Sequence, residues 1–463
     1  MYAEKITRRT QLAILSSGLL AFIGILVETS LNVAFPTLIK VLHVSLATVQ
    51  WLTSGYLLMT TLVMSTTAFL LQKFQARHLF TVAISCFFMG TLLGLFTPNF
   101  GILLCGRLLQ AISTGIATPL MFHIILETIP QDKLGIYNGI ASMIISFAPA
   151  LGPTYGGVMT SFLSWRMIFG FIIPILILLF VLGFYSIRIK TIYRHRQFDW
   201  LGLVLLAGIF VGFVEAFNQA GQHGFGSKAF ITLLGLASAM TLLMIMHIRY
   251  GKRQLLNFAI LKKPIVSLRA LNFVILQFIN IGVAFVIPVF SQNYLHVNAM
   301  TAGLIVLPGS ILGAIVAPIA GRYYDQHGPK LPFLVANIAM MIGTGLMFLL
   351  TPQLTIMATA LIYMCLRLGF NSGFGNTISD ASKQVSLADK GDVNSLFNTL
   401  QQYAGSLGTV VLSALIAVSE MHHSNYHGYA TMLGSHWAFL LLVVLTVIGL
   451  LTTIIINRLQ KQN

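Results

Sequence analysis

The sequence predicts an all-α polytopic membrane protein with fourteen transmembrane helices and both termini in the cytoplasm. Three observations predict this fold class: the composition, a recurring length of apolar run, and the placement of lysine and arginine. Of the 463 residues, 57% are hydrophobic and only 8% are charged. So few charges cannot cover a large water-facing domain. Hydrocarbon must therefore be the solvent for most of the chain.

Apolar runs of about 18 to 25 residues recur along the chain, which is the length of helix that crosses a bilayer. They lie at about 12–38, 48–70, 79–96, 101–124, 136–160, 167–187, 201–218, 229–248, 265–289, 302–320, 332–351, 354–374, 394–418 and 436–457. No gap between them could hold a folded domain. The first run is long and lacks a small-residue cleavage site, so we expect a retained helix and not a signal peptide.

The basic residues indicate the topology. The formal net charge is +16. If the N-terminus lies inside, nearly all lysines and arginines fall in inner segments, and the outer loops contain only Lys40, Arg166 and Lys228. Because lysine and arginine resist translocation, this asymmetry predicts cytoplasmic termini and an even number of helices. The excess charge therefore indicates topology and contact with membrane lipids, and no nucleic-acid partner is expected.

The chain also contains an internal repeat. An offset of about 252 to 260 residues aligns uncommon residues of the two halves, as in duplicated transporters. The aligned pairs are Pro36 with Pro288, Arg107 with Arg367, and Asn138 with Asn398. We therefore expect six-helix halves at 1–190 and 253–463. Residues 191–252 form an insertion that carries two further helices, giving a six plus two plus six arrangement.

Several segments together resemble the major facilitator superfamily, and more narrowly its fourteen-helix drug:proton antiporter family. ETSLNVAFP at 28–36 resembles the first-helix signature, with Glu28 where aspartate is usual, and APALGPTYGG at 148–157 resembles the fifth-helix antiporter motif. Trp51, Tyr56, Arg107 and Gln110 match further family positions, although Ala111 replaces the usual glycine. The resemblance covers nearly the whole chain. It implies alternating access about a central cavity in a bacterial cell membrane.

The family's cytoplasmic loop motif is kept in only one half. In the second half its landmarks are Gly321, Asp325, Gly328 and Lys330. In the first half, Ala68, Gln72, Gln75 and Ala76 stand at landmark positions of the motif. If this motif holds the cytoplasmic ends together, we expect a gate at Gly321, Asp325 and Gly328. We also expect a weaker closure on the side of Gln72.

Glu28 is the leading candidate for proton coupling. It lies in the outer half of the first predicted helix, and Arg107 lies at a similar depth on a helix that runs the other way. A carboxylate in hydrocarbon must be neutral, paired or near a wet cavity, and a carrier can alternate among these states. The alternative is a fixed hydrogen bond between helices. Asn32 lies one turn further on, and Asn280 is the repeat counterpart of Glu28.

Arg107, Gln110 and Thr114 form a polar stripe at i, i+3 and i+7 on an otherwise apolar helix. Such a stripe must face protein or water. We assign proton coupling to Glu28 and Arg107, and the candidate substrate cavity to Asn32, Gln110, Thr114, Asn280 and Arg367. The alternative for both arginines is a structural bond to backbone carbonyls at a helix crossing.

The fifth-helix motif brings helix-breaking and small residues into a membrane span. Its members are Pro149, Gly152, Pro153, Gly156 and Gly157. Proline removes a helical hydrogen bond and glycine permits close approach of two backbones, so we expect a kinked, tightly packed helix. Motion about this helix and a static packing role are both consistent with the motif.

The leading functional hypothesis is a proton-coupled antiporter that exports amphipathic or cationic organic compounds. The alternatives are a translocator of lipids or fatty acids on the same fold, and a non-transporting membrane sensor or scaffold. Templates for nucleotide binding, serine hydrolysis and zinc hydrolysis are absent from the sequence, so no enzyme activity, cofactor or metal is expected. The expected partners are a small amphipathic molecule, protons and membrane lipids, with a monomer as the functional unit.

Overall fold

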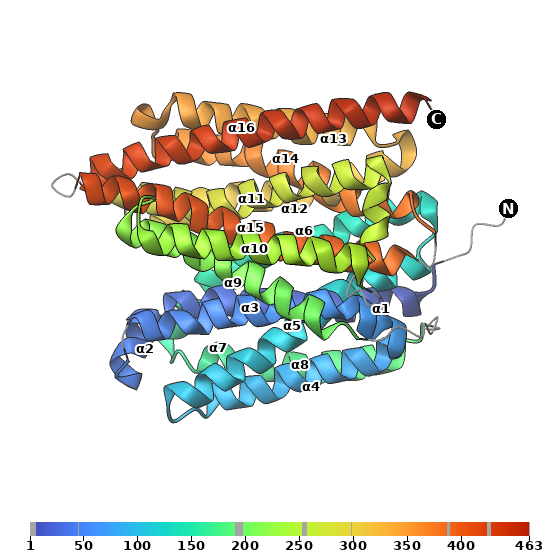
Figure 1. Ribbon diagram of the computed structural model, residues 1–463. Coiled ribbons are helices and arrows are strands. Elements are labelled where there is room, and N and C mark those ends of the chain that lie inside the picture. Colours follow the sequence, from blue (N-terminus) through green and yellow to red (C-terminus); the bar gives the residue numbers. More distant parts are fainter. Residues whose placement is uncertain are drawn as a thin grey trace.

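The computed structural model describes residues 6–44, 46–189, 198–251, 257–297, 299–386, 389–423 and 427–462. A few side chains inside helices, including those of Asn32 and Pro153, also lie outside the description. The described residues are almost entirely helical, and long helices run side by side along one axis (Figure 1). The start of α1 and the end of α16 lie at the same end of this bundle (Figure 1). We call it the cytoplasmic end, as the charge pattern predicts.

The first part of the chain supplies the helices for the first six predicted spans. They are α1 (Arg8–Val33), α2 (Phe35–Leu42), α3 (Leu46–Lys73), α4 (Ala76–Leu95), α5 (Phe100–Thr128), α6 (Leu134–Phe162), α7 (Met167–Gly170) and α8 (Ile173–Ser186). The short α2 follows the outer end of α1, so the first predicted span extended too far. The sixth predicted span is divided between α7 and α8.

The rest of the chain contains the inserted pair and the second set of helices. They are α9 (Trp200–His223), α10 (Lys228–Tyr250), α11 (Pro264–Asn293), α12 (Ala299–His327), α13 (Lys330–Leu349), α14 (Ile356–Lys383), α15 (Lys390–His422) and α16 (His427–Gln462). Short 3-10 helices at Gln131–Lys133, Phe258–Lys262 and Thr351–Gln353 join neighbouring helices.

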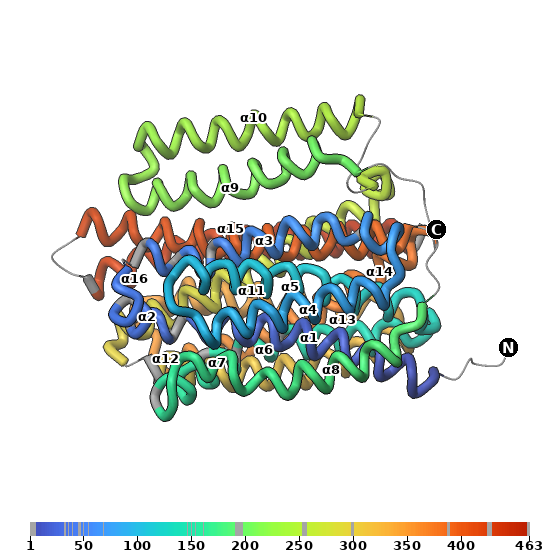
Figure 2. Tube along the Cα trace, turned by 90° about the horizontal axis from the view of Figure 1, so that it is seen from below, coloured from blue at the N-terminus to red at the C-terminus, as the bar shows by residue number. Residues whose placement is uncertain are grey.

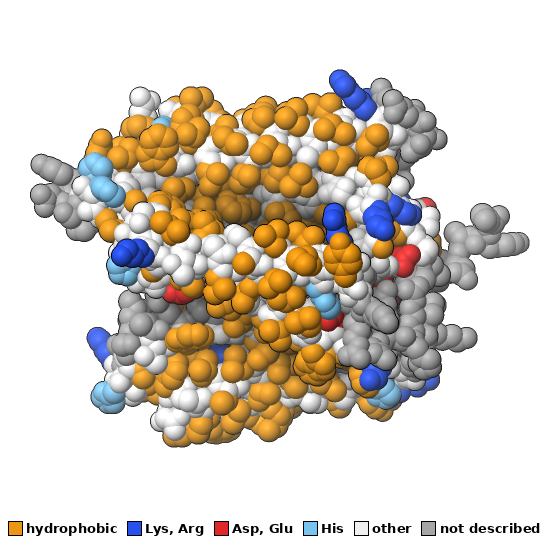
Figure 3. Space-filling model, in the orientation of Figure 1, with side chains coloured by type: hydrophobic (Ala, Val, Ile, Leu, Met, Phe, Trp, Pro, Cys, Tyr) orange, Lys and Arg blue, Asp and Glu red, His pale blue; other side chains and the backbone are white. Residues whose placement is uncertain are grey.

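Thirteen helical stretches within the described residues are long and apolar enough to cross a membrane. The predicted span at 354–374 coincides with α14, which has 28 residues but is not among the thirteen. Its inner half contains Asn371, Asn376 and Asp380, all buried against other helices. Burial inside protein removes the need for an apolar surface. On the face seen in Figure 3, hydrophobic side chains cover the middle and charged ones gather toward the two ends.

α9 and α10 lie beside the main bundle (Figure 2). α9 packs against α15, where Tyr403 contacts Phe210 and Phe213 with ring centroids 5.8 and 6.4 Å apart. α10 exposes most of its surface and contacts α9 through Ala237 against Gly212. The predicted domain limits at 190/191 and 252/253 fall on or beside segments outside the described residues.

α5 continues through Pro119, which has no N–H to donate to the carbonyl of Gly115. Thr67 of α3 donates its hydroxyl to that carbonyl instead, at 3.2 Å. A neighbouring helix thus satisfies the backbone group that proline leaves open, which is how membrane helices tolerate proline. The bond also fixes α3 against α5, the two helices that carry much of the polar centre described next.

Candidate functional site

Arg107 of α5 occupies the centre of a polar cluster in the first half. Its side chain is only 1% exposed. Its Nη1 donates to Gln110 Oε1 at 2.9 Å, and Gln110 Nε2 in turn donates to Thr91 of α4 at 3.1 Å. The guanidinium lies 4.2 Å from the centre of the Tyr56 ring, a cation–π distance. Its Nε and Nη2 are buried and have no hydrogen-bond partner among the described residues.

Tyr56 of α3 ties three helices together at this depth. Its hydroxyl donates to the Gly24 carbonyl of α1 at 3.0 Å and lies 2.6 Å from Thr114 Oγ1 of α5. A Cβ on Gly24 would lie 2.0 Å from the Thr114 hydroxyl, so only glycine fits here. In an α-helix the carbonyl of Gly24 is also the acceptor for the N–H of Glu28. The tyrosine therefore fixes the turn of α1 that carries the acid.

Glu28 lies beside this cluster and is only half-buried. Its charge is within interaction range of Arg107 and Tyr56. Within the described part of the chain, no hydrogen bond or ion pair reaches its carboxylate. The predicted neighbourhood of Glu28, Arg107, Gln110 and Thr114 is thus found in the structure. The side chain of Asn32, the remaining first-half cavity prediction, lies outside the described residues.

The fifth-helix motif packs directly on α1 beside Glu28. A Cβ on Gly152 would lie 1.8 Å from Thr29 Oγ1, and one on Gly156 would lie 2.2 Å from the Ser30 carbonyl oxygen. Gly157 has nothing within 4 Å of its Cβ position. Pro149 is exposed, and the side chain of Pro153 is outside the described residues. α6 is one continuous helix through the motif. Two of its glycines therefore serve close packing with the helix that carries the acid.

The repeat counterparts in the second half also meet. Arg367 of α14 donates through Nη1 to the side-chain oxygen of Asn280 on α11. Asn371 donates to the Arg367 carbonyl at 3.0 Å, and the guanidinium lies 5.4 Å from the Phe370 ring centre. The position of Glu28 is thus taken by an amide that binds the arginine. The two predicted cavity residues of this half form a direct contact.

The predicted gate residues join the two halves at the cytoplasmic end. Asp325, near the end of α12, accepts hydrogen bonds from the N–H groups of Gly135 and Ile136, each at 2.8 Å. These N–H groups lie in the first turn of α6, where a carboxylate is favoured by the helix dipole. A Cβ on Gly321 would lie 2.1 Å from the Gly135 carbonyl oxygen. Gly328 ends α12 with φ +83°, a conformation that favours glycine.

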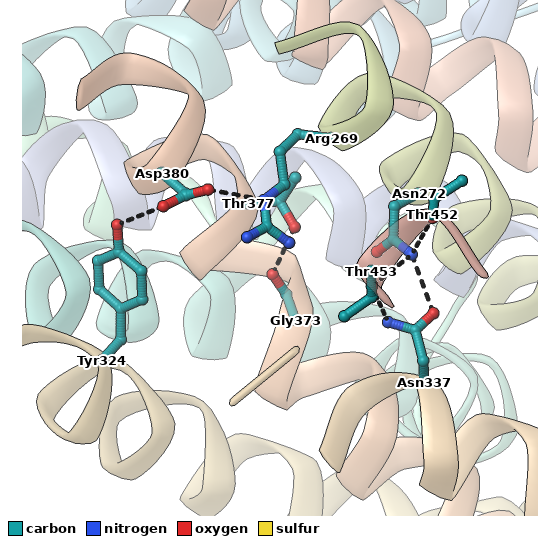
Figure 4. Close-up of polar contacts among 9 residues, drawn as sticks. All are labelled: Arg269, Asn272, Tyr324, Asn337, Gly373, Thr377, Asp380, Thr452 and Thr453. Atoms are coloured by element: carbon teal, nitrogen blue, oxygen red, sulfur yellow. Dashed lines mark hydrogen bonds and ion pairs between the residues drawn. The ribbon is translucent and has the colours of Figure 1, made fainter. Parts of the chain in front are cut away.

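A buried ion pair near the same end was missed by sequence reasoning. Arg269 of α11 donates through Nε to Asp380 of α14 at 2.6 Å, and Tyr324 of α12 donates to the other carboxylate oxygen at 3.1 Å (Figure 4). The Arg269 guanidinium lies 3.4 Å from the Phe333 ring centre. The predicted span ended at 374, which left Asp380 in a loop, whereas α14 runs on to Lys383. A longer window tolerant of buried polar residues would have included it.

A second polar cluster in Figure 4 is built from amides and hydroxyls. Asn272 of α11 donates to Asn337 of α13 at 2.9 Å and to the Gly449 carbonyl of α16 at 2.9 Å. Asn337 donates to Thr453 of α16 at 2.9 Å. These bonds hold three helices of the second half to one another. Since every member is neutral, this cluster has a packing role.

Every described hydrogen bond between the first and second sets of helices lies in the cytoplasmic halves of those helices. Besides Asp325, the bonds are Asn138 to Ser379 at 2.8 Å, Lys390 to Leu126 at 3.4 Å, Asn394 to Pro119 at 2.6 Å, and Thr399 to Ser65 at 3.3 Å. Glu28 and Arg107 lie toward the other end of α1 and α5. The structure is therefore closed between the halves at the cytoplasmic end.

Comparisons with known proteins identify the family. The family described as the Major Facilitator Superfamily matches residues 17–409. The lincomycin resistance protein LmrB of Listeria innocua is 32% identical over 458 residues, with 96% of each chain covered. The tetracenomycin C resistance and export protein of Streptomyces glaucescens is 26% identical, covering 84% of this chain and 73% of its own.

A solved structure shows the same fold at low sequence identity. The proton:xylose symporter XylE superposes with a TM-score of 0.64 at 14% identity, covering 95% of this chain and 94% of its own. The sequence motifs, the helical membrane fold and the match over most of the chain agree. This chain belongs to the Major Facilitator Superfamily and is a multi-pass membrane transporter of small molecules, not an enzyme.

Proposed function

We propose that this transporter exports amphipathic or cationic drugs in exchange for protons, as a member of the fourteen-helix antiporter family with α14 as its remaining span. The observation that carries the proposal is the loose placement of Glu28 beside Arg107. The carboxylate has no described hydrogen bond, and two nitrogens of the guanidinium are buried with no hydrogen-bond partner in the described part of the chain. Relatives named for lincomycin resistance and tetracenomycin C export support the substrate class.

The physical basis of exchange is competition for one carboxylate. When Glu28 is ionised it can bind a cationic substrate or take up a proton, and it cannot hold both. A proton from outside displaces the substrate and binds the carboxylate. The transporter then changes from its outward-facing to its inward-facing state, and the carboxyl group releases its proton inside. The fixed charge of Arg107 favours the ionised form and so favours release of the proton.

The two facing states require movement between the halves. α6 packs on α1 through Gly152 and Gly156, and it is also the helix whose first turn binds Asp325. A change at Glu28 can therefore reach the cytoplasmic gate through one continuous helix. We propose that Asn280 and Arg367 line the opposite wall of the substrate path, and that the monomer is the functional unit.

Transport in inverted membrane vesicles tests the proposal. Vesicles containing the protein should accumulate lincomycin when their interior is acidified, and accumulation should stop when the pH gradient is collapsed. Vesicles with Glu28→Gln should give no gradient-driven accumulation at equal protein content. Transfer of a fluorescent fatty acid or phospholipid in place of lincomycin would support the lipid translocator instead. If neither lincomycin nor the fluorescent lipids were moved, the proposed export of amphipathic compounds would be contradicted.

A further inference from the structure

A buried lysine, Lys390, lies at the beginning of α15 in the second half. With Asn138 aligned to Asn398, the counterpart of Leu134, where α6 begins, is Asn394. α15 instead begins at Lys390, one turn earlier. Lys390 is buried at the boundary between the halves, with only 6% of its surface exposed. A buried ammonium is costly unless it is compensated by partners.

The compensating partners of Lys390 lie on α5, in the other half. Lys390 Nζ donates to the Leu126 carbonyl at 3.4 Å. This carbonyl belongs to the last turn of α5, and the fourth residue after it is Pro130, which has no N–H to offer. The negative charge of Glu127, the next residue of α5, is within interaction range of the ammonium. The end of α5 therefore presents an open carbonyl and an acid to Lys390.

The location of Lys390 is unfavourable for its own helix. A cation at a helix N-terminus opposes the helix dipole, whereas the same cation at the C-terminus of another helix is favoured. Lys390 occupies both positions at once, at the start of α15 and the end of α5. Asp392 in the same turn offsets part of the cost within α15. The arrangement is favourable only while α15 rests on α5, which is the closed state of this end.

Further residues of α15 continue the contact with the first half toward the membrane centre. Asn394, one turn after Lys390, donates to the Pro119 carbonyl of α5 at 2.6 Å. Thr399 lies 3.3 Å from Ser65 of α3. On the other side of the interface, Asp325 of α12 binds the first turn of α6. Gln72, which matches Asp325 in the repeat, has a buried Oε1 with no partner among the described residues.

We propose that Lys390 is a cytoplasmic gating residue that replaces the lost acid of the first-half loop motif. One side of the closed interface is held by a carboxylate on a helix N-terminus, and the other by an ammonium on a helix C-terminus. Opening to the cytoplasm separates Lys390 from Leu126 and Glu127 and exposes it to water. The contact that closes the cytoplasmic end beside Gln72 then depends on Lys390 of α15 and not on the first-half loop motif. The proposal is independent of which compound or ion is carried.

Distances between spin labels at the cytoplasmic end test this proposal. Labels are placed on cysteines at Gln75 and Arg458, both exposed, after Cys86, Cys105 and Cys365 are replaced by serine. We expect Lys390→Met to increase the ratio of open to closed populations by at least about threefold. Asp325→Asn should produce a shift in the same direction. Lys390→Arg, which keeps the charge, should retain most of the closed population.

Matched controls separate gating from general damage. Lys262→Met removes an exposed cytoplasmic lysine and should leave the distances unchanged. Glu127→Gln should give a shift in the same direction as Lys390→Met but smaller. If Lys390→Met does not yield folded protein, Lys390→Gln provides the same test with a polar side chain. An unchanged distribution in the neutral Lys390 variant, alongside a clear shift for Asp325→Asn, would overturn the proposal.

Discussion

Asp380 and Glu28, two acids inside the helical bundle, have opposite surroundings. Asp380 has both carboxylate oxygens occupied, one by Arg269 and the other by Tyr324, and its side chain is almost fully buried. Glu28 is half-buried and has no described bond, although Arg107 lies within range. An acid held by a guanidinium and a phenol cannot take up a proton without leaving a buried charge unpaired. The loosely held acid is free to change its state.

If the transporter exchanges drug for protons as proposed, this difference predicts different roles for the two halves. The first half contains an ionisable group beside an arginine with unused donors, as a proton carrier requires. In the second half, Asn280 binds Arg367 where the repeat places the counterpart of Glu28. An amide keeps the hydrogen bond and gives up the ability to ionise. We therefore expect changes at Glu28 to affect coupling, and changes at Asp380 to affect folding.

The largest effect is expected for Glu28→Gln. The amide retains the shape of the side chain but cannot bind or release a proton, so gradient-driven export should be abolished. The melting temperature of the purified protein should stay close to that of the wild type, because no described bond is lost. Glu215→Gln, in the inserted pair, is the matched control and should transport normally. Near-normal export by the Glu28 variant would remove this residue from the mechanism.

A strong effect is expected for Arg107→Lys. A lysine cannot place separate donors toward Gln110 and Glu28 while stacking on the Tyr56 ring. Loss of one charge-assisted hydrogen bond corresponds to roughly 1.5–3 kcal/mol, so initial transport rates should fall at least about tenfold. Arg367→Lys should have the smaller effect, since its described hydrogen bond goes to the neutral amide of Asn280. Unaltered kinetics for Arg107→Lys would indicate a structural arginine.

Asp380→Asn should reduce stability more than coupling. Removing one partner of a buried ion pair costs about 3–5 kcal/mol, because Arg269 is left uncompensated. The melting temperature in detergent should fall markedly, while the protein that remains folded should still respond to a pH gradient. Asp132→Asn, which changes an exposed acid at the same end, is the control. An unchanged melting temperature together with lost coupling would reverse the roles assigned to the two acids.

The fold class could be predicted because membrane burial leaves a simple mark on the sequence. The length of the apolar runs and the placement of lysine and arginine follow from the bilayer alone. The family match confirms the fold. Asn280 and Arg367 were both predicted as cavity residues, and the structure adds the direct contact between them. The limits of α14 were missed because its polar inner half is buried by neighbouring helices and carries no apolar signal.

The contacts between helices far apart in the chain could not be read from the sequence. Arg269 and Asp380 are more than a hundred residues apart, and only packing brings them together. The loop motif predicted a gate at Asp325, and in the structure this carboxylate of α12 accepts hydrogen bonds from the first turn of α6. The role of Lys390 depends on one extra turn of α15 and on an open carbonyl of α5. Pro130 indicates the open carbonyl of Leu126, but no local pattern in the sequence indicates that Lys390 reaches it.

The smallest effect separates two adjacent glycines of the fifth-helix motif. Gly156→Ala would place a methyl group 2.2 Å from the Ser30 carbonyl oxygen, which is backbone and cannot move aside, whereas Gly157→Ala meets nothing within 4 Å. Alanine gains about 1 kcal/mol of helix propensity over glycine at either position. The difference in stability between the two variants therefore isolates the contact with α1. Gly156→Ala should destabilise the protein by about 1–3 kcal/mol, as overpacking does, and Gly157→Ala should be neutral or slightly stabilising. Thermal unfolding of the two variants side by side measures that difference. Equal melting temperatures would mean that α6 does not pack on α1 as closely as the structure shows, and would weaken the link between Glu28 and the gate.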